Sequence, residues 1–463
     1  MSPAQFAGAL KVGNLNLLFM SGKLYLYTVV SALGGLLFGF DTAIINGAIP
    51  FFSEYFALTE TMVGWAVSSA IFGCIIGALF IGVFSDKYGR RYMLRVMALF
   101  FILSAFGSGI STNIYMFIAF RILGGLAIGG ASVLSPVYIS EIAPPAYRGR
   151  LTMAFQMSIV VGILLAFATA LALLDTGEYN WRYMFISEAA PALIFFVLLF
   201  FVGRSPRWLV KNGNYKEAGE VLDTLNYGID IDRMVEEIKS SINSEVVDHI
   251  RYLFRKPYLR LVLIGLAVGM FNQFTGIAVV MIYSSDIFRA AGFTTESAIL
   301  QTVVVGFTNL TFTIIAMFFI DKIGRKRMLL IGSVGMSIFL AIFAYIFFYD
   351  IKGFMPLVFM ISFVACFAFS QGAVIWVLFA EMFPNNIRAR GSSVGSFSHW
   401  VFYALVLFVF PVMRGSFVDN RGIGYVFAFF ALVTFGSFFF FKRFLVETKC
   451  KSLEDLEKDI MKE

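Results

Sequence analysis

Charged residues are scarce in this chain. Asp, Glu, Lys and Arg make up 14% of its 463 residues, whereas hydrophobic types make up 59% and the mean hydropathy is +0.83. A water-soluble domain is usually about a quarter charged. The sequence therefore has too little polar surface to cover a soluble body of this size, and we expect lipid to be its main solvent.

Histidine and cysteine are also rare. The only histidines are His249 and His399, too few for a histidine-based metal site. Cys74, Cys366 and Cys450 are odd in number and far apart, which argues against a disulfide framework or a zinc site. Because the sequence also has no nucleophile–base set and no nucleotide-binding loop, we expect no enzyme activity, cofactor or metal.

Apolar stretches near or above 18 residues recur along the chain, and each is long enough to cross a hydrocarbon core of roughly 30 Å. We place the membrane spans at roughly 23–48, 62–84, 92–110, 114–139, 151–173, 183–203, 259–288, 298–320, 328–348, 355–380, 391–413 and 422–441. An even number of spans leaves both termini on one side. The predicted fold class is an all-α membrane protein with twelve transmembrane helices.

Lys and Arg are distributed unequally between the loops. One set of loops carries Lys87, Arg90, Arg91, Arg95, Arg148, Arg150, Lys322, Arg325, Lys326, Arg327, Arg388, Arg390, Lys442 and Arg443. The loop Phe51–Thr61 has none and carries Glu54 and Glu60. Positive loops stay in the cytoplasm, so we predict that both termini are cytoplasmic. The net charge of +7 is then a topology signal, and we expect no nucleic-acid partner.

A long polar segment, 204–258, divides the chain. Helix-like patterns within it cover Tyr215–Leu225, Ile231–Ile242 and Val246–Phe254. We interpret 204–258 as a cytoplasmic linker of short amphipathic helices. It joins an N-terminal six-helix bundle, 1–203, to a C-terminal six-helix bundle, 259–445, and a cytoplasmic tail follows at 446–463.

Two motifs occur twice. The run Asp86–Arg91 returns as Asp321–Lys326, and the pattern E-x-x-P-x-x-x-R occurs at Glu141–Arg148 and again at Glu381–Arg388. The offsets between the copies are nearly equal. This indicates a duplicated half that holds about six spans, with the two copies in parallel orientation.

Both repeated motifs fall on predicted cytoplasmic loops, where acids face bases. We predict a cytoplasmic gate whose ion pairs hold the halves together when the inside is closed. The gate residues are Asp86, Arg90, Glu141, Arg148, Asp321, Arg325, Glu381 and Arg388. Solvent-exposed pairs contribute only about 0–1 kcal/mol each, so such a network can open. The simpler alternative is anchoring by positive charge on the inside.

Few ionisable residues lie within spans, and Asp41, Arg121 and Glu188 are the clearest. Such residues are costly in hydrocarbon and are functional candidates by default. Counting from the predicted outer ends puts them at similar depths of roughly 13, 12 and 9 Å. An arginine between two carboxylates would keep one ionised, while the other could take up a proton. The alternative is a purely structural salt bridge.

Seven further stretches are specific in their residues: Gly39–Thr42, Arg121–Gly125, Pro136–Glu141, Arg148–Arg150, Trp181–Phe185, Ser205–Trp208 and Glu447–Lys449. With these stretches the chain resembles, over nearly its whole length, the sugar porters of the major facilitator superfamily, and above all their bacterial proton-coupled xylose and hexose symporters. The resemblance implies the major facilitator fold, with two pseudo-symmetric six-helix bundles. It also implies proton-coupled symport of a monosaccharide, a pentose or hexose, by alternating access.

The resemblance also implies roles for single residues. In proton-coupled members an Asp of the first span, an Arg of the fourth and a Glu of the sixth form the coupling site, and Asp41, Arg121 and Glu188 occupy those positions. The family's sugar site is a ring of amides, which donate and accept hydrogen bonds, and of indoles, which stack on the sugar. The implied substrate-binding residues are Gln156, Asn272, Gln273, Asn309, Trp376, His399 and Trp400. Depth counting alone does not bring Gln156 level with the others, so this ring rests on the resemblance.

Some positions depart from the family pattern, among them Ala278, which stands where an Asn is usual, and Arg204, which reverses a charge. The sequence does not name the sugar. A facilitative sugar uniporter, a non-transporting sugar sensor and a polyol or inositol carrier stay open as alternatives. We expect a sugar and a proton as partners, membrane lipid around a working monomer, and a location in the bacterial inner membrane.

Overall fold

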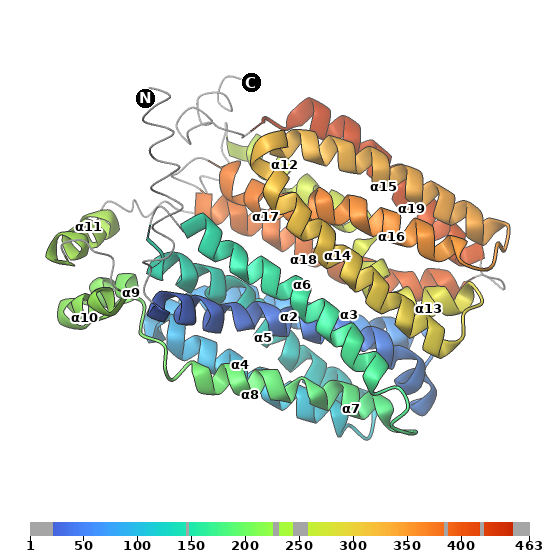
Figure 1. Ribbon diagram of the computed structural model, residues 1–463, viewed down its shortest axis with the longest axis horizontal. Coiled ribbons are helices and arrows are strands. Elements are labelled where there is room, and N and C mark those ends of the chain that lie inside the picture. Colours follow the sequence, from blue (N-terminus) through green and yellow to red (C-terminus); the bar gives the residue numbers. More distant parts are fainter. Residues whose placement is uncertain are drawn as a thin grey trace.

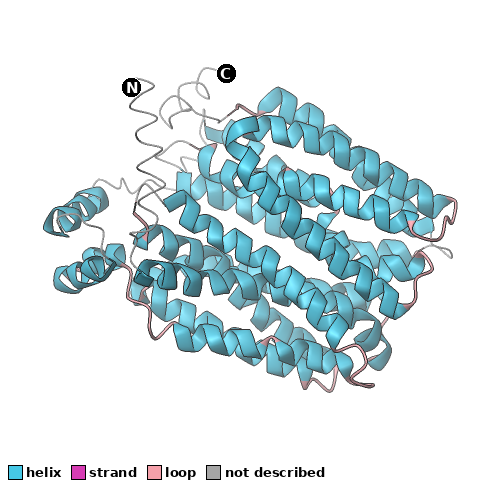
Figure 2. Cartoon of the chain, in the orientation of Figure 1, coloured by secondary structure: helices cyan, strands magenta, loops and turns pink. Residues whose placement is uncertain are grey.

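The computed structural model describes residues 22–144, 148–225, 231–243, 258–383, 388–416 and 421–447. Within these ranges, twelve helical segments are long and apolar enough to cross a membrane. Figure 2 shows helices joined by loops throughout the described residues. The predicted all-α membrane protein with twelve transmembrane helices is therefore confirmed.

The helices fall into an N-terminal and a C-terminal set, which lie side by side in Figure 1. The N-terminal set comprises α2 (Gly22–Tyr55), α3 (Glu60–Tyr88), α4 (Arg90–Gly109), α5 (Ile114–Ile142), α6 (Arg148–Ala172), α7 (Asn180–Ser187) and α8 (Ala189–Leu198). The C-terminal set comprises α12 (Tyr258–Gln273), α13 (Ile277–Ala290), α14 (Thr295–Ile323), α15 (Arg325–Phe348), α16 (Met355–Phe369), α17 (Gln371–Glu381), α18 (Arg388–Gly415) and α19 (Arg421–Phe444).

The internal repeat is visible in how two equivalent helices begin and end. Helix α3 begins after Thr59, whose hydroxyl accepts a hydrogen bond from the Met62 amide, and it ends at Gly89 with φ +90°. Helix α14 begins after Thr294 with the same kind of cap and ends at Gly324 with φ +99°. A glycine tolerates this left-handed backbone at little cost. The repeated motif thus supplies the same sharp turn into the next helix in both halves.

Close approach of helices within a half depends on glycine. Gly73 on α3 faces Gly125 on α5, and a Cβ atom added at Gly73 would lie 2.9 Å from the Gly125 Cα. Real Cβ atoms essentially never come so close. Small residues at such crossings allow backbones to touch, which is how helices gain packing energy where lipid provides no hydrophobic drive.

Three of the predicted spans, 183–203, 259–288 and 355–380, are each formed by two helical segments. The sixth breaks at Glu188, three residues before Pro191, whose ring cannot fill a helix interior without loss of a hydrogen bond. The seventh breaks at Gly276, which has φ +82°. In the tenth, Ser370 leaves helical geometry, and its hydroxyl donates to the Cys366 carbonyl at 2.6 Å. The sequence predicts these three spans, and the structure adds the breaks within them.

The linker contains α9 (Pro206–Lys211), α10 (Tyr215–Leu225) and α11 (Ile231–Asn243), at the left end of the molecule in Figure 1. Its first helix was not predicted. The Trp208 indole N–H donates to the Asp86 carbonyl at 2.9 Å, which holds the linker at the end where α3 terminates. The predicted helix Val246–Phe254 and most of the tail 446–463 lie outside the described residues.

The two sets of helices contact each other at the end opposite the linker. Asn46 on α2 is fully buried there, and its amide donates to the Met281 carbonyl at 3.1 Å and to the Ser284 hydroxyl at 2.8 Å. The Ser285 hydroxyl donates back to the Asn46 carbonyl at 2.8 Å. Helix α3 also packs against α18, and α6 against α14. These contacts hold α13 against α2.

Candidate functional site

A cavity with a volume of about 140 Å³ lies between the two sets of helices, and we call it the central cavity. It adjoins the breaks between α12 and α13 and between α16 and α17. All seven residues of the predicted substrate site line it: Gln156, Asn272, Gln273, Asn309, Trp376, His399 and Trp400. The structure therefore brings together side chains from four separate spans of one half and one span of the other, while their role stays a prediction.

A chain of amides forms one wall of the central cavity. The Asn272 amide donates to the Gln371 side-chain oxygen at 3.3 Å, and the Gln273 amide donates to the Asn272 oxygen at 3.1 Å. The Gln273 nitrogen also lies 3.0 Å from Nδ1 of His399. The Gln273 side-chain oxygen is buried and has no hydrogen-bond partner among the described residues. A buried acceptor in this state is expected to be paired, so it offers a place for a hydroxyl donor.

Aromatic rings also line the central cavity. The Trp376 and His399 ring centroids are 5.0 Å apart, and His399 lies parallel to Tyr403. The Trp400 ring contacts Phe38 of the other half at 5.5 Å between centroids. Such faces pack against the C–H groups of a solute, while the amides bond its polar groups. The cavity therefore suits a small molecule that carries many hydroxyls on a compact ring.

Asp41 on α2, Arg121 on α5 and Glu188 at the break between α7 and α8 form a buried charge cluster. None is more than 2% exposed. Arg121 pairs with Asp41 through its Nη1 atom. Glu188 forms no ion pair among the described side chains, and the charges that act on it are those of Asp41 and Arg121. The structure thus gathers the three predicted coupling residues, while their coupling role stays a prediction.

The buried charge cluster has one donor and two acceptors without partners among the described residues. Asp41 Oδ2, Arg121 Nε and Glu188 Oε1 have no hydrogen-bond partner within the described part of the chain. A Cβ atom added at Gly124 would lie 2.8 Å from Asp41 Oδ2, so the glycine provides the room for this carboxylate. A buried carboxyl group must be paired with a cation or carry a proton. With one arginine and two acids, this cluster can hold a proton.

The central cavity and the buried charge cluster meet on α2. Phe38 and Thr42 line the cavity, whereas Asp41 faces Arg121. The Thr42 hydroxyl donates to the Phe38 carbonyl at 2.8 Å. Asp41 is therefore the direct chain neighbour of a residue of the cavity wall, Thr42.

The predicted gate residues form pairs within each half. Arg90 lies 2.8 Å from Asp86 and 3.1 Å from Glu141. In the other half, Arg325 lies 3.1 Å from Glu381. The side chains of Arg148, Asp321 and Arg388 lie outside the described set. Closure of the two halves by these pairs stays a prediction.

The predicted substrate site left out several residues that line the central cavity, among them Phe38, Thr42, Thr313 and Tyr403. Helical spacing offered a signal for two of them. Thr313 follows Asn309 by four residues and Tyr403 follows His399 by four, which puts each on the same helix face as a predicted residue. Gln371, which accepts a hydrogen bond from Asn272, follows the break at Ser370, and the sequence did not indicate that break.

Comparison with known proteins gives consistent matches over almost the entire chain. Residues 27–460 match the family described as "Sugar (and other) transporter". The arabinose-proton symporter of Bacillus subtilis is 36% identical, over 94% of this chain and 95% of its own length. The D-xylose-proton symporter of Escherichia coli K12 is 35% identical, over 96% of this chain and 97% of its own.

Solved structures of the xylose transporter XylE from E. coli are similar in fold. The inward-open conformation has a TM-score of 0.82 at 33% identity and covers 94% of this chain and 99% of that one. The partially occluded inward-open conformation has a TM-score of 0.83, with 93% of this chain and 100% of that one covered. A crystal structure of the D-xylose-proton symporter scores 0.78 over 93% of this chain.

Proposed function

This chain belongs to the "Sugar (and other) transporter" family, and from that premise we propose that it carries a monosaccharide, a pentose or hexose, across a membrane together with a proton. The observation that carries this proposal is the pairing of two sites. A cavity lined by amides and aromatic rings lies one residue along α2 from a buried cluster of two acids and one arginine. The names of the arabinose- and xylose-proton symporters point to the same function.

Sugar recognition would rest on the central cavity. Its amides can donate to and accept from hydroxyl groups, and the Gln273 oxygen has an unused acceptor position. The rings of Trp376 and Trp400 offer apolar faces for the sugar ring. Both halves contribute residues, with Gln156 from the N-terminal half. A bound sugar would therefore contact both halves at once, as a substrate must if it is to favour their movement.

Proton coupling would rest on the buried charge cluster. The pair between Asp41 and Arg121 attracts only while Asp41 is a carboxylate. A proton on Asp41 would cancel that attraction and free Arg121 to interact with Glu188, the second buried acid. The exchange of partners would shift α2 relative to α5, and α2 carries Phe38 and Thr42 of the cavity wall. Protonation of Asp41 would thus affect the sugar site through a shift of α2.

Alternating access would follow from movement of the two halves about the central cavity. In the structure the halves are joined by the hydrogen bonds of Asn46, at the end opposite the linker. The similarity to inward-open XylE supports assignment of this state as inward-facing. The basic loops support cytoplasmic termini. The lining of the linker end with repeated acid–base pairs supports a cytoplasmic gate there.

The test is transport by the purified protein in sealed vesicles. Labelled pentoses, hexoses and a polyol are offered singly, with and without an inward proton gradient. Accumulation of one sugar above its outside concentration, only when the gradient is imposed, supports symport. Equilibration without accumulation under both conditions replaces the proposal with the facilitative uniporter. Preference for the polyol replaces the monosaccharide as substrate.

A further inference from the structure

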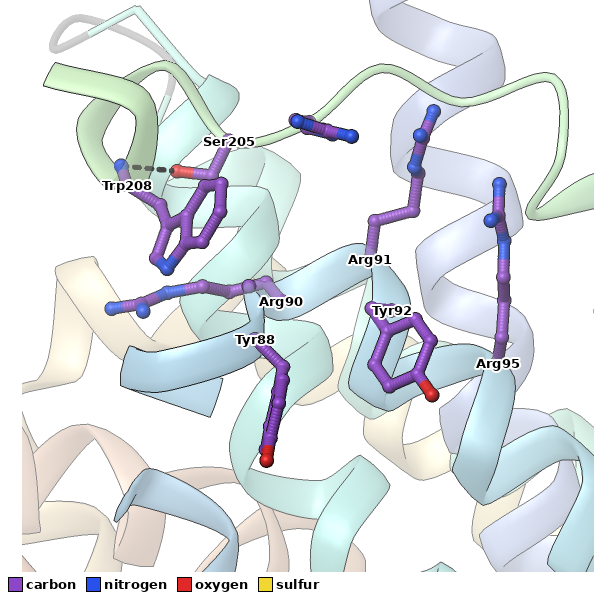
Figure 3. A pocket seen from close by; sticks show the side chains of 9 residues that line it. Tyr88, Arg90, Arg91, Tyr92, Arg95, Ser205 and Trp208 are labelled. Carbon is purple, nitrogen blue, oxygen red and sulfur yellow. Dashed lines mark hydrogen bonds between the residues drawn. The ribbon is translucent and has the colours of Figure 1, made fainter. Parts of the chain in front are cut away.

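A second pocket, with a volume of about 160 Å³, lies at the linker end of the N-terminal half. The end of α3, the first two turns of α4, and the start of α9 with the loop before it form this pocket (Figure 3). We call it the basic pocket because four arginines line it: Arg90, Arg91, Arg95 and Arg204. It shares no residue with the central cavity, and sugar transport as described above does not use it.

The four arginines are not equivalent. Arg90 is neutralised by Asp86 and Glu141, and in Figure 3 it points away from Arg91 and Arg95, which run in the same direction. Among the described side chains, neither Arg91 nor Arg95 forms an ion pair. The charged groups that act on Arg95 are Arg91 and Arg204, both cations.

The partners that these arginines do have are almost all neutral. Arg91 donates to the Val202 carbonyl at 2.6 Å, and Arg95 donates to the Leu199 carbonyl at 3.0 Å. Arg204 has an acid, Glu217, at 3.4 Å, but both side chains are more than 40% exposed, and such a pair is weak. Three cations therefore converge with one weakly held acid. With so little acid beside them, these cations can attract an anion from outside the chain.

Backbone groups add to the attraction for an anion. Helix α4 is 20 residues long and begins after Gly89, which has no side chain to cap it. The first amide groups of a helix lack intrahelical acceptors and carry partial positive charge. Arginine guanidinium groups bind phosphate through paired N–H donors, and helix starts favour the same ligand. The pocket therefore matches a phosphate group in both charge and donor supply.

The surroundings indicate where that phosphate would come from. Phe200 and Phe201, beside the Leu199 carbonyl, are exposed, and in a membrane protein such side chains face acyl chains. The Phe200 ring lies 4.0 Å from the Arg95 guanidinium. Tyr88 and Tyr92, on the pocket wall, are also exposed, and tyrosines gather at the headgroup level of a bilayer. The pocket thus has cations within and apolar groups along its rim.

We propose that the basic pocket binds the phosphate of an anionic membrane lipid, with Arg91, Arg95 and Arg204 around the headgroup and the acyl chains along Phe200 and Phe201. A free phosphate would satisfy the cations but would make no contact with the apolar rim. A lipid satisfies both. The bound headgroup would bridge α4 to the loop that leads into the linker, because Arg95 is on α4 and Arg204 is in that loop.

The test is lipid binding to the purified full chain, measured by native mass spectrometry during titration with phosphatidylglycerol. Phosphatidylcholine with the same acyl chains carries phosphate without net charge and is the lipid control. Loss of one cation near a lipid surface should weaken binding about fivefold, and reversal of its charge about thirtyfold. We expect the first from Arg204→Gln and the second from Arg204→Glu. The exposed side chain of Arg204 makes both substitutions compatible with folding.

The matched control is Arg233→Glu on α11, which makes the same change in net charge outside the pocket. Unchanged affinity in this variant, together with the graded loss at Arg204, supports the proposal. An equal loss in both charge reversals overturns it, because the effect would then be one of net charge. Equal affinity for the two lipids also overturns it. If inorganic phosphate displaces phosphatidylglycerol at a concentration similar to that of the lipid, the source is a soluble phosphate and not the membrane.

Discussion

Replacement of Asp41 by Asn separates sugar binding from proton coupling. The change keeps the size of the side chain and leaves an oxygen that can accept from Arg121, so we expect the bundle to stay folded. It removes the carboxyl group that would take up and release the proton. No side chain that lines the central cavity is replaced, because Asp41 does not line it. Sugar affinity should therefore survive, whereas accumulation should fail.

The size of the expected effect follows from the free energy of the gradient. One pH unit corresponds to about 1.4 kcal/mol per proton, which is a factor of about ten in concentration. With one proton per sugar, an inward gradient of one pH unit should drive the native protein toward about tenfold accumulation. Asp41→Asn should reach only the outside concentration. The difference is large enough to be measured with labelled sugar in vesicles.

The control is Asp350→Asn, the same chemical change at an exposed residue paired with Lys352. It should accumulate sugar like the native protein. Exchange of labelled for unlabelled sugar at equal pH needs no net proton movement and should persist in Asp41→Asn. If Asp41→Asn accumulates sugar as well as the native protein does, Asp41 is not the coupling residue and the reasoning from the buried charge cluster is refuted.

Three further changes probe the sites separately. Gln273→Ala removes a donor and an acceptor from the amide wall and should weaken sugar binding by about 1–3 kcal/mol in calorimetry. The control Gln301→Ala, at a residue buried outside the central cavity, should leave sugar affinity unchanged, and equal effects of the two changes would contradict the site. Gly124→Ala puts a methyl group 2.8 Å from the carboxylate of the buried charge cluster and should lower accumulation, whereas Gly82→Ala, with nothing within 4 Å, should not. In a cysteine-free background, Glu54→Cys should react with an impermeant thiol reagent from outside and a cysteine on α10 only after permeabilisation; the reverse pattern would invert the topology.

Much of the fold could be predicted because lipid imposes simple requirements on a chain. The length of each apolar stretch marks a span, and the basic loops mark its direction. The breaks at Gly276 and Ser370 could not be predicted in this way, because hydropathy stays high on both sides of them. A break depends on local backbone geometry, such as the left-handed φ of Gly276, to which a hydropathy average is insensitive.

The candidate site was predictable in part. Depth along a helix follows from counting residues, and it put Asp41, Arg121 and Glu188 at one level. Depth says nothing of direction around the helix, so it could not indicate that Arg121 pairs with Asp41 and leaves Glu188 without an ion pair among the described side chains. Gln156 entered the predicted ring through the family resemblance alone, and the structure does bring it to the central cavity.

The hydrogen bonds of Asn46 to α13 have a consequence for the timing of the transport cycle. Each contributes about 0.5–1.5 kcal/mol net, so the three together favour the arrangement of the structure, which we propose to be inward-facing, by a factor between about ten and two thousand. An empty carrier would then spend most of its time with its cavity turned to the cytoplasm. The slow step of the cycle would be the return of the empty carrier to the outward-facing state, because the three hydrogen bonds must break for that change. Net uptake would be limited by how quickly the unloaded protein comes back, and not by how quickly sugar crosses.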